Sequence, residues 1–192
     1  MGLTGGLGAG KSEALRALGE LGAATLSTDD VVHELLASDL HDEVVKRLGP
    51  EVAPDGRIDR SLVARRVFGD DEARAWLEGL LWPRVGERVA AWRAGLAAAA
   101  PPPRAAVVEV PLLFESGMEG VFDHTIAVVA EEATRERRAA ARGHAALAAR
   151  AGRQLSQAEK AQRADFSVRN DGTLEELKDS LSRVLAKLDP SP

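Results

Sequence analysis

The opening residues of the chain have the types and the spacing needed to bind phosphate. Gly5, Gly10, Lys11 and Ser12 satisfy the pattern G-x-x-x-x-G-K-S/T of a phosphate-binding loop. Glycines let such a backbone fold into a ring of inward N–H donors, and the helix that follows adds the positive end of its dipole. The lysine of this pattern reaches the β- and γ-phosphates, and its hydroxyl residue is a ligand for Mg²⁺. The sequence therefore predicts nucleotide binding at this loop.

The elements that must position the loop are a strand before it and a helix after it. Apolar residues at 14, 15, 18 and 21 recur at helical spacing directly behind the loop. The four residues that precede Gly5 are fewer than the about five or six of an ordinary strand. Either the first strand is very short, or the natural protein begins a few apolar residues upstream, and we expect the latter.

Composition narrows the class of protein. The 192 residues suffice for one domain with a real hydrophobic core and an inserted subdomain. The absence of cysteine excludes disulfides and thiolate metal sites. The net charge of -5 argues against nucleic acid as a partner, and no apolar run has the length of a membrane span. We expect a cytoplasmic protein without a nucleic-acid or membrane partner.

A carboxylate follows the second predicted strand. Residues 23–26 have strand character, and a helix is predicted from about Val31 to Leu40. In an open α/β sheet, ligands bind at the carboxyl ends of the strands, so we expect Asp29 in the same crevice as the phosphate loop. There it could orient an acceptor hydroxyl, take its proton, or hold metal-bound water. An N-cap role is the alternative, and it fits Asp30.

The middle of the chain is predicted to be helical. Apolar residues recur at helical spacing between 42 and 96, a block too long for one crossover helix between neighbouring strands. We interpret it as a helical subdomain that covers the acceptor side of the cleft. Four of its arginines could meet an anionic substrate, although a solvated charged face is the simpler interpretation. They are Arg57, Arg60, Arg65 and Arg66.

The second half of the chain supplies further strands. Residues 105–110 and 125–129 have the pattern of buried strands. Glu109 lies where a strand-borne acid could support magnesium. Together with the phosphate loop, this pattern predicts an α/β fold whose parallel sheet is flanked by helices.

The C-terminal part of the chain is predicted to contain helices and one further strand. A helix is expected over 154–164, followed by a short edge strand at 166–168. Thr173 and Glu176 have the spacing of a capping box, which predicts the start of the final helix.

An arginine-rich segment, 134–153, lies between these parts. Arg135, Arg138 and Arg142 are three and four residues apart, so a helix would place them on one face. Guanidinium groups suit the charge of a transferring phosphoryl group, and the small residues after Gly143 could form a mobile lid. A plain solvated helix and a nucleic-acid patch are the alternatives, and the latter lacks interleaved aromatic residues.

Several groups of residues match the pattern of one family. Leu3-Thr-Gly-Gly-Leu-Gly-Ala-Gly-Lys-Ser12 corresponds to LTGGIGSGKS, Thr28-Asp29 to part of D-A-D-x-x-x-R, and Val110-Pro-Leu-Leu-Phe-Glu115 to PLLFE. The spacing of a later R-x-x-x-Q, K, AD and N-x-G series is kept by Arg150, Gln154, Lys160, Ala164-Asp165 and Asn170-x-Gly172. On these residues, almost the whole chain resembles the dephospho-CoA kinases, the P-loop kinases of the last step of coenzyme A synthesis.

The resemblance implies a fold, a reaction and a division of the chain. The fold would be of the P-loop NTPase, nucleoside-monophosphate-kinase-like type, with a helical substrate-domain insertion and a lid. The single kinase domain 1–192 would comprise a nucleotide-binding core, a CoA subdomain and a lid: 1–30 with 104–133 and 154–192, then 31–100, then 134–153. The reaction would move the γ-phosphoryl group of ATP to the ribose 3′-hydroxyl of dephospho-CoA, with Mg²⁺, in a monomer or weak homo-oligomer.

The resemblance also implies site residues by their positions in the motifs. ATP would bind to Gly8, Ala9, Gly10, Lys11, Ser12 and Glu13. Magnesium would be held by Ser12 and Asp29. The catalytic residues would be Lys11, Asp29, Arg138 and Arg142.

Four positions depart from the family pattern. Ser27 stands in place of an aspartate, His33 in place of an arginine, Trp82 in place of a histidine, and Glu13 where threonine is common. The changes at His33 and Trp82 concern the contacts to dephospho-CoA, whereas the nucleotide half is intact. The alternatives are another small-molecule kinase of this fold, of nucleoside monophosphate or shikimate type, and a nucleotide-dependent regulatory protein without turnover.

Overall fold

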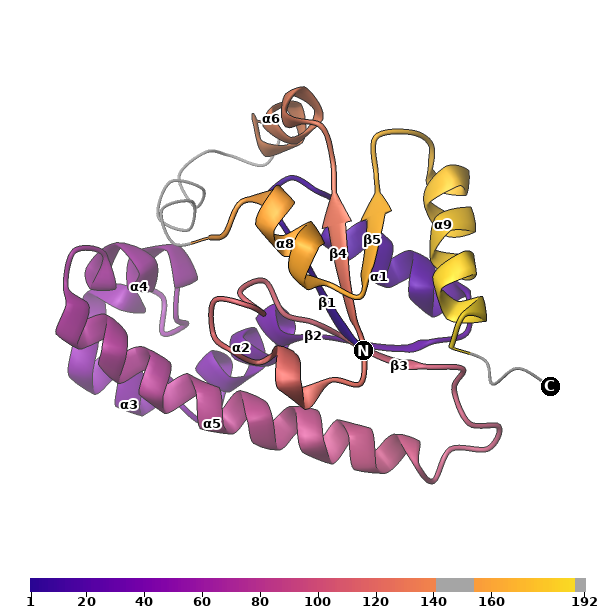
Figure 1. Cartoon of the computed structure of the whole chain (residues 1–192). Coiled ribbons are helices and arrows are strands. Elements are labelled where there is room, and N and C mark those ends of the chain that lie inside the picture. The colour runs from indigo at the N-terminus through magenta and orange to yellow at the C-terminus, as the bar shows by residue number, and fades with distance from the viewer. Residues whose placement is uncertain (141–153, 189–192) are drawn as a thin grey trace. The chain divides into compact units, whose positions relative to one another are not determined.

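Five parallel strands form one sheet in the computed structural model, which describes residues 1–140 and 154–188. The strands lie in the order β2-β3-β1-β4-β5. They are β1 Gly2–Gly5, β2 Ala24–Ser27, β3 Ala106–Glu109, β4 Thr125–Val129 and β5 Phe166–Arg169, which Figure 1 labels. The predicted α/β fold with a parallel sheet is confirmed, and so is the edge position of the strand that begins at Phe166.

The chain divides into two units. The first unit, 1–27 with 93–192, contains the sheet. Its helical segments are α1 Lys11–Glu20, η2 Glu119–Val121, α6 Glu132–Ala140, α8 Gln157–Arg163 and α9 Leu174–Ala186. The second unit, 28–92, is helical, whereas the sequence suggested a subdomain over 31–100. It contains α2 Thr28–Ala37, α3 His41–Leu48, η1 Pro50–Val52, α4 Arg60–Val67 and most of α5 Asp71–Leu96.

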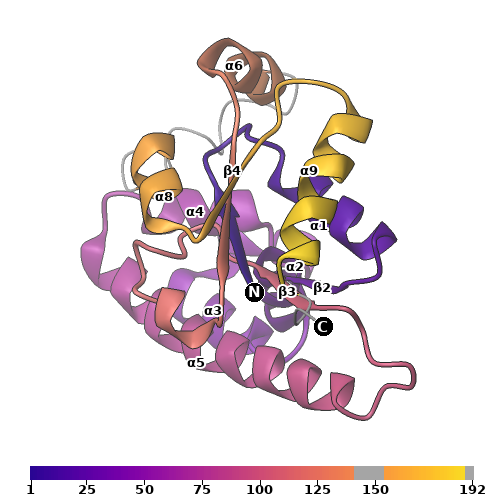
Figure 2. The same cartoon turned by 45° about the vertical axis from the view of Figure 1, so that its right-hand side comes forward.

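Helices cover both faces of the sheet in the first unit. α1 and α9 pack against each other on one face, and α8 packs on the other face against β1 and β4 (Figure 2). The core between them includes the fully buried side chains of Leu3, Leu18, Ile126 and Leu181. Burial of such side chains stabilises the fold by roughly 1.5–3 kcal/mol each. This core holds the strand ends that carry the loops described below.

The strand before the phosphate loop is short and central. β1 has four residues and pairs with β3 on one side and with β4 on the other. The amino group of Met1 donates to the carbonyl oxygen of Ala106 at 2.6 Å, which extends the contact with β3. A strand of this length can thus be held from both edges. The expectation of an upstream start stays a prediction.

The order of the strands changes direction beside β1, which is where ligands bind in open parallel sheets. From β1 the chain passes through α1 to β2, toward one edge of the sheet. From β3 it passes to β4, toward the other edge. β1 and β3 are neighbours whose connections leave in opposite directions, and ligands bind at the carboxyl ends of such strands. The loop 6–10 follows β1 at this point, and Val110 follows β3.

Two predicted helix boundaries are corrected by the structure. The second helix begins at Thr28 rather than near Val31, so Asp29 and Asp30 lie inside its first turn. Carboxylates are favourable there because they face the positive end of the helix dipole. The helix expected over 154–164 spans Gln157–Arg163, because Ser156 caps its first turn in a capping box with Glu159.

Candidate active site

The backbone of the phosphate loop uses its glycines in two ways. Gly8 and Gly10 have φ angles of +75° and +90°, which side chains rarely allow. A Cβ atom at Gly8 would lie 2.6 Å from the carbonyl oxygen of Arg135, so the absence of a side chain also lets the backbone of α6 lie close to the loop. Gly10 is the N-cap of α1 and provides no side-chain cap. The first N–H groups of α1 are therefore oriented for an anion.

Lys11 is the cation of this loop. Its Nζ donates to the carbonyl oxygens of Gly5 and Gly6 at 3.1 and 3.3 Å. The next residue, Ser12, is exposed, and Glu13 forms a 3.7 Å ion pair with Arg16. Because the Glu13 carboxylate faces Arg16, its contribution to an anion site would come from its backbone N–H.

Asn170 fastens the loop to the end of the sheet. Its side chain is buried, and Nδ2 donates to the carbonyl oxygen of Ala9 at 2.9 Å. Its backbone N–H donates to Val129 at 2.8 Å, and its carbonyl oxygen accepts a 2.9 Å bond from Arg138. Asn170 thus links the loop, β4 and α6 in one buried junction.

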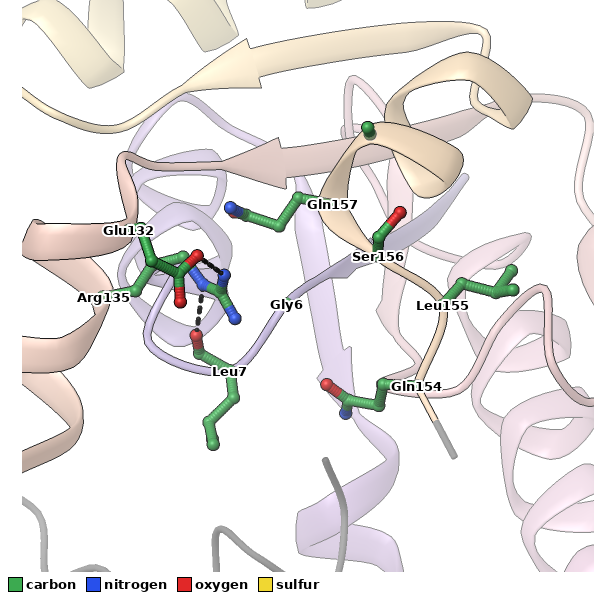
Figure 3. A pocket seen from close by; sticks show the side chains of 9 residues that line it. Gly6, Leu7, Glu132, Arg135, Gln154, Leu155, Ser156 and Gln157 are labelled. Atoms are coloured by element: carbon green, nitrogen blue, oxygen red, sulfur yellow. Dashed lines mark hydrogen bonds and ion pairs between the residues drawn. The ribbon is translucent and has the colours of Figure 1, made fainter. Parts of the chain in front are cut away.

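Arg135 fastens the other side of the loop. Its Nε donates to the carbonyl oxygen of Leu7 at 2.8 Å, and its guanidinium pairs with Glu132 at 2.6 Å (Figure 3). Arg135 and Asn170 therefore both bind loop carbonyls, at Leu7 and Ala9. Hydrogen bonds that occupy the carbonyl oxygens of a loop favour the orientation in which its N–H groups point the other way.

A pocket of about 420 Å³ opens beside the loop (Figure 3). It is lined by Gly6, Leu7, Glu132, Arg135, Gln154, Leu155, Ser156, Gln157 and Ala158. Gln157 is fixed by two bonds to Ala130, accepting from its N–H at 2.9 Å and donating to its carbonyl oxygen at 2.8 Å. The wall of the pocket is therefore tied to the end of β4.

An ion pair with a fully buried lysine connects α8 to the segment that follows β3. Lys160 is 0% exposed, and its Nζ lies 2.9 Å from Oε1 of Glu115. The same ammonium donates to the carbonyl oxygen of Pro111 at 2.8 Å and to Oγ1 of Thr4 at 3.5 Å. Oε1 of Glu115 also accepts the N–H of Leu155 at 2.8 Å. The pair therefore joins β1, the segment after β3 and the start of the pocket wall.

A buried carboxylate lies at the carboxyl end of β3. Glu109 is the last residue of β3, is 4% exposed, and is in register with Leu3 of β1. Hydroxyl and carboxylate oxygens are hard donors that suit Mg²⁺, which keeps several waters and phosphate oxygens as ligands. Ser12 and Glu109 therefore fit such an ion. Within residues 1–140 and 154–188, no three His, Asp or Glu side chains cluster as a metal site of their own.

The predicted catalytic carboxylate, Asp29, belongs to the second unit. It lies in the first turn of α2, two residues beyond the end of β2. Arg60 of α4 contacts it twice: one guanidinium nitrogen lies 3.3 Å from the backbone carbonyl oxygen and another 3.4 Å from Oδ1. Asp30, its neighbour, is exposed. The Asp29 side chain is therefore held from α4.

The predicted site residues thus fall into three groups. In the first unit, the loop residues Gly8 to Glu13 lie together, and Arg138 reaches the Asn170 that binds the loop. Asp29 is in the second unit. Arg142 lies outside the described residues, as does the segment 141–153 of the expected lid.

Sequence reasoning gave no structural role to Arg135, Asn170 or Lys160. Their partners are 128, 161 and 45 residues away along the chain, at Leu7, Ala9 and Glu115. The sequence marked Asn170 and Lys160 only by their positions in motifs, and Arg135 by its charge and its helical spacing with Arg138 and Arg142.

Comparison with known proteins gives one consistent result. A family model described as dephospho-CoA kinase matches residues 1–176. A dephospho-CoA kinase of Protochlamydia amoebophila is 40% identical, over 97% of this chain and 94% of its own length. A dephospho-CoA kinase of Thermus thermophilus is 36% identical, over 98% of this chain and 91% of its own length.

Solved structures show the same similarity. TT1252 of Thermus thermophilus is 36% identical and superposes with a TM-score of 0.81, over 97% of this chain and 96% of the other. A dephospho-CoA kinase of Campylobacter jejuni, 22% identical, shares the fold with a TM-score of 0.68 over 97% and 95%. From the model match and the sequence identities, the chain belongs to the dephospho-CoA kinase family.

Proposed function

We propose that this protein phosphorylates the ribose 3′-hydroxyl of dephospho-CoA with ATP, which yields coenzyme A and ADP. The observation that carries the proposal is the phosphate loop, held by Asn170 and Arg135 at the crevice of the sheet, in a chain that matches the dephospho-CoA kinase model over 1–176. In the reaction, the bond between the γ-phosphorus and the β–γ bridging oxygen breaks, and a bond from that phosphorus to the 3′-oxygen forms. ADP leaves with the bridging oxygen.

The loop supplies the nucleotide site in this proposal. The backbone N–H groups from Gly8 to Glu13 bind the β- and γ-phosphates at the positive end of α1. Lys11 moves from the carbonyls of Gly5 and Gly6 to the phosphate oxygens, which are stronger acceptors because they are charged. Preorganised donors of this kind stabilise the charge that develops during phosphoryl transfer.

Asp29 acts on the acceptor. Its carboxylate accepts a hydrogen bond from the 3′-hydroxyl, orients the oxygen toward the γ-phosphorus, and takes its proton as the new bond forms. The second unit, 28–92, provides the binding surface for dephospho-CoA. Arg138 of α6 adds positive charge near the transferring group, and Arg142, which lies outside the described residues, is proposed to do the same.

A magnesium ion fits the oxygen donors Ser12 and Glu109 at the crevice, and Asp29 is a further candidate ligand. When bound, it neutralises phosphate charge and lowers the repulsion between ATP and the acceptor oxygen. Cytoplasmic location and a monomer or weak homo-oligomer are part of the proposal. No helix among the described residues is long and apolar enough to cross a membrane.

The test is ADP release from ATP and Mg²⁺ with dephospho-CoA, with AMP, with shikimate, or without an acceptor. We expect strong stimulation by dephospho-CoA alone. Stimulation by AMP or shikimate would assign the chain to another small-molecule kinase activity. Tight ATP binding without stimulation by any acceptor would favour a regulatory nucleotide-binding protein.

A further inference from the structure

The second unit contains one arginine that contacts the proposed catalytic carboxylate at two points. Arg60 directs one nitrogen of its guanidinium to the backbone carbonyl oxygen of Asp29 and the other to Oδ1, at 3.3 and 3.4 Å. The two side chains are 36% and 38% exposed, so both are partly removed from water. Because the planar fork spans the main chain and the side chain of one residue, it restricts the side-chain rotamer of Asp29.

The start of α4 is built to hold Arg60 in place. Arg60 is the first residue of α4, directly after the N-cap Asp59. The Asp59 carboxylate accepts from the backbone N–H and the hydroxyl of Ser61 at 2.7 and 2.6 Å, and these bonds, the hydroxyl first, hold its pKa below the usual value. The N–H of Asp59 donates to the carbonyl oxygen of Val52, a buried residue, at 2.9 Å. The backbone that carries Arg60 is therefore fixed from both sides.

Other Arg–carboxylate pairs of this unit have a different form. Arg88 and Asp39 meet at 2.9 Å and are 51% and 53% exposed, and Arg47 and Glu72 meet at 2.8 Å and are 48% and 85% exposed. These pairs join side-chain atoms at more exposed positions. Pairs of that kind contribute little to stability and constrain little. The contact at Asp29 differs because it includes the backbone and is more enclosed.

We infer that Arg60 is a positioning residue for the phosphoryl transfer: it holds the Asp29 carboxylate in the orientation that receives the acceptor hydroxyl. This inference rests on the proposed function. The guanidinium also offsets the charge of Asp29, which would otherwise repel an incoming phosphate group. Arg60 acts through Asp29, so its removal is expected to affect the chemical step more than the binding of ATP.

The experiment combines Arg60→Gln and Arg60→Lys with Asp29→Asn in a double-mutant cycle, using kcat and the KM values for ATP and dephospho-CoA. Arg60→Gln should lower kcat by about 10- to 100-fold, the cost of a misplaced catalytic group. The KM for ATP should change by less than about twofold, since the phosphate loop is untouched. Arg60→Lys, which keeps the charge without the fork, should recover part of the loss.

The Asp29→Asn background separates positioning from direct contact with substrate. If Arg60 acts through Asp29, adding Arg60→Gln to Asp29→Asn should cost less than about twofold in kcat. Arg88→Gln is the matched control, since it breaks an Arg–Asp pair of the same unit, and its kcat should equal that of the wild type. Urea midpoints measured for every variant identify any loss that is due to unfolding.

Two results would overturn the inference: an unchanged kcat in Arg60→Gln, and an equal loss of kcat in both backgrounds. An unchanged kcat with a raised KM for dephospho-CoA would make Arg60 a binding residue for the acceptor. Full activity of Asp29→Asn would remove the role of Asp29 and with it the inference, while the proposed reaction would stand. If the wild-type protein shows no ADP release that depends on dephospho-CoA, the proposed function itself fails, and this outcome is distinct from the others.

Discussion

The two units hold their polar side chains in different ways. In the first unit, Asn170 and Lys160 are buried, and both donate to backbone carbonyl oxygens. In the second unit, the pairs of Arg88 with Asp39 and of Arg47 with Glu72 are more exposed. Buried hydrogen bonds fix one geometry, whereas exposed ion pairs are screened and rearrange at low cost. The buried bonds of the first unit therefore hold the phosphate loop in one geometry, whereas these pairs of the second unit constrain their surroundings little.

The largest effect on stability is expected where the buried pair is broken. Lys160→Met leaves the Glu115 carboxylate without its ammonium partner and should lower the free energy of unfolding by about 3–5 kcal/mol. Urea unfolding measures this loss. Lys160→Met combined with Glu115→Gln should recover part of it, because the uncompensated charge is gone. If the free energy of unfolding of Lys160→Met lies within about 1 kcal/mol of the wild-type value, this ion pair does not fix the region.

A smaller effect is expected at the junction of loop and sheet. Asn170→Ala removes the donor to the carbonyl of Ala9 and should cost about 1–3 kcal/mol. It should also raise the KM for ATP, because the loop loses one of its fixed orientations, while the KM for dephospho-CoA stays near the wild-type value. Ser167→Ala, at an exposed position of β5, is the control. Equal changes in both KM values would contradict a role confined to the nucleotide half.

A further effect depends on pH. Asp165 accepts bonds from the hydroxyl and the N–H of Thr125 at 2.8 and 2.7 Å, and these bonds, the hydroxyl first, lower its pKa below the ordinary 3.8. Because the folded pKa is below the unfolded one, the stabilisation is present above about pH 4 and is lost as the pH falls through the folded pKa.

Asp165→Asn tests this dependence. The variant should have a flatter decline of the urea midpoint between about pH 5 and pH 3 than the wild type. Asp179→Asn, at an exposed carboxylate of α9, should keep the wild-type decline. Parallel curves for Asp165→Asn and the wild type would exclude the hydrogen bonds of Thr125 as a source of acid sensitivity.

The smallest effect is expected at the surface of the second unit. Glu72→Gln breaks the pair with Arg47 and leaves the stacking of Arg47 on Trp76 in place. The free energy of unfolding should change by less than about 1 kcal/mol, and less still in high salt. A loss as large as that of Asn170→Ala would remove the contrast between the two units.

Local signals predicted much of the fold. The strand Thr125–Val129 and the capping box of Thr173 with Glu176 were predicted correctly from the sequence, because a short apolar run and a capping box are local patterns. The burial of Lys160 could not be predicted in this way, since a lysine is usually exposed and its partner Glu115 lies in another motif. Arg60 was interpreted as part of a solvated face, because its contact with Asp29 joins two helices 31 residues apart.

In the proposed reaction, Asp29 and the phosphate loop transfer a phosphoryl group to dephospho-CoA. The reaction is tested by mass spectrometry and phosphorus NMR of the product formed from dephospho-CoA, ATP and Mg²⁺ by the wild type and by Asp29→Asn. We predict a product heavier by one phosphate on the ribose 3′-oxygen, formed about 10²- to 10⁴-fold more slowly by Asp29→Asn. ATP hydrolysis without this product would contradict the proposed reaction, and an equal rate in Asp29→Asn would contradict the catalytic role of Asp29.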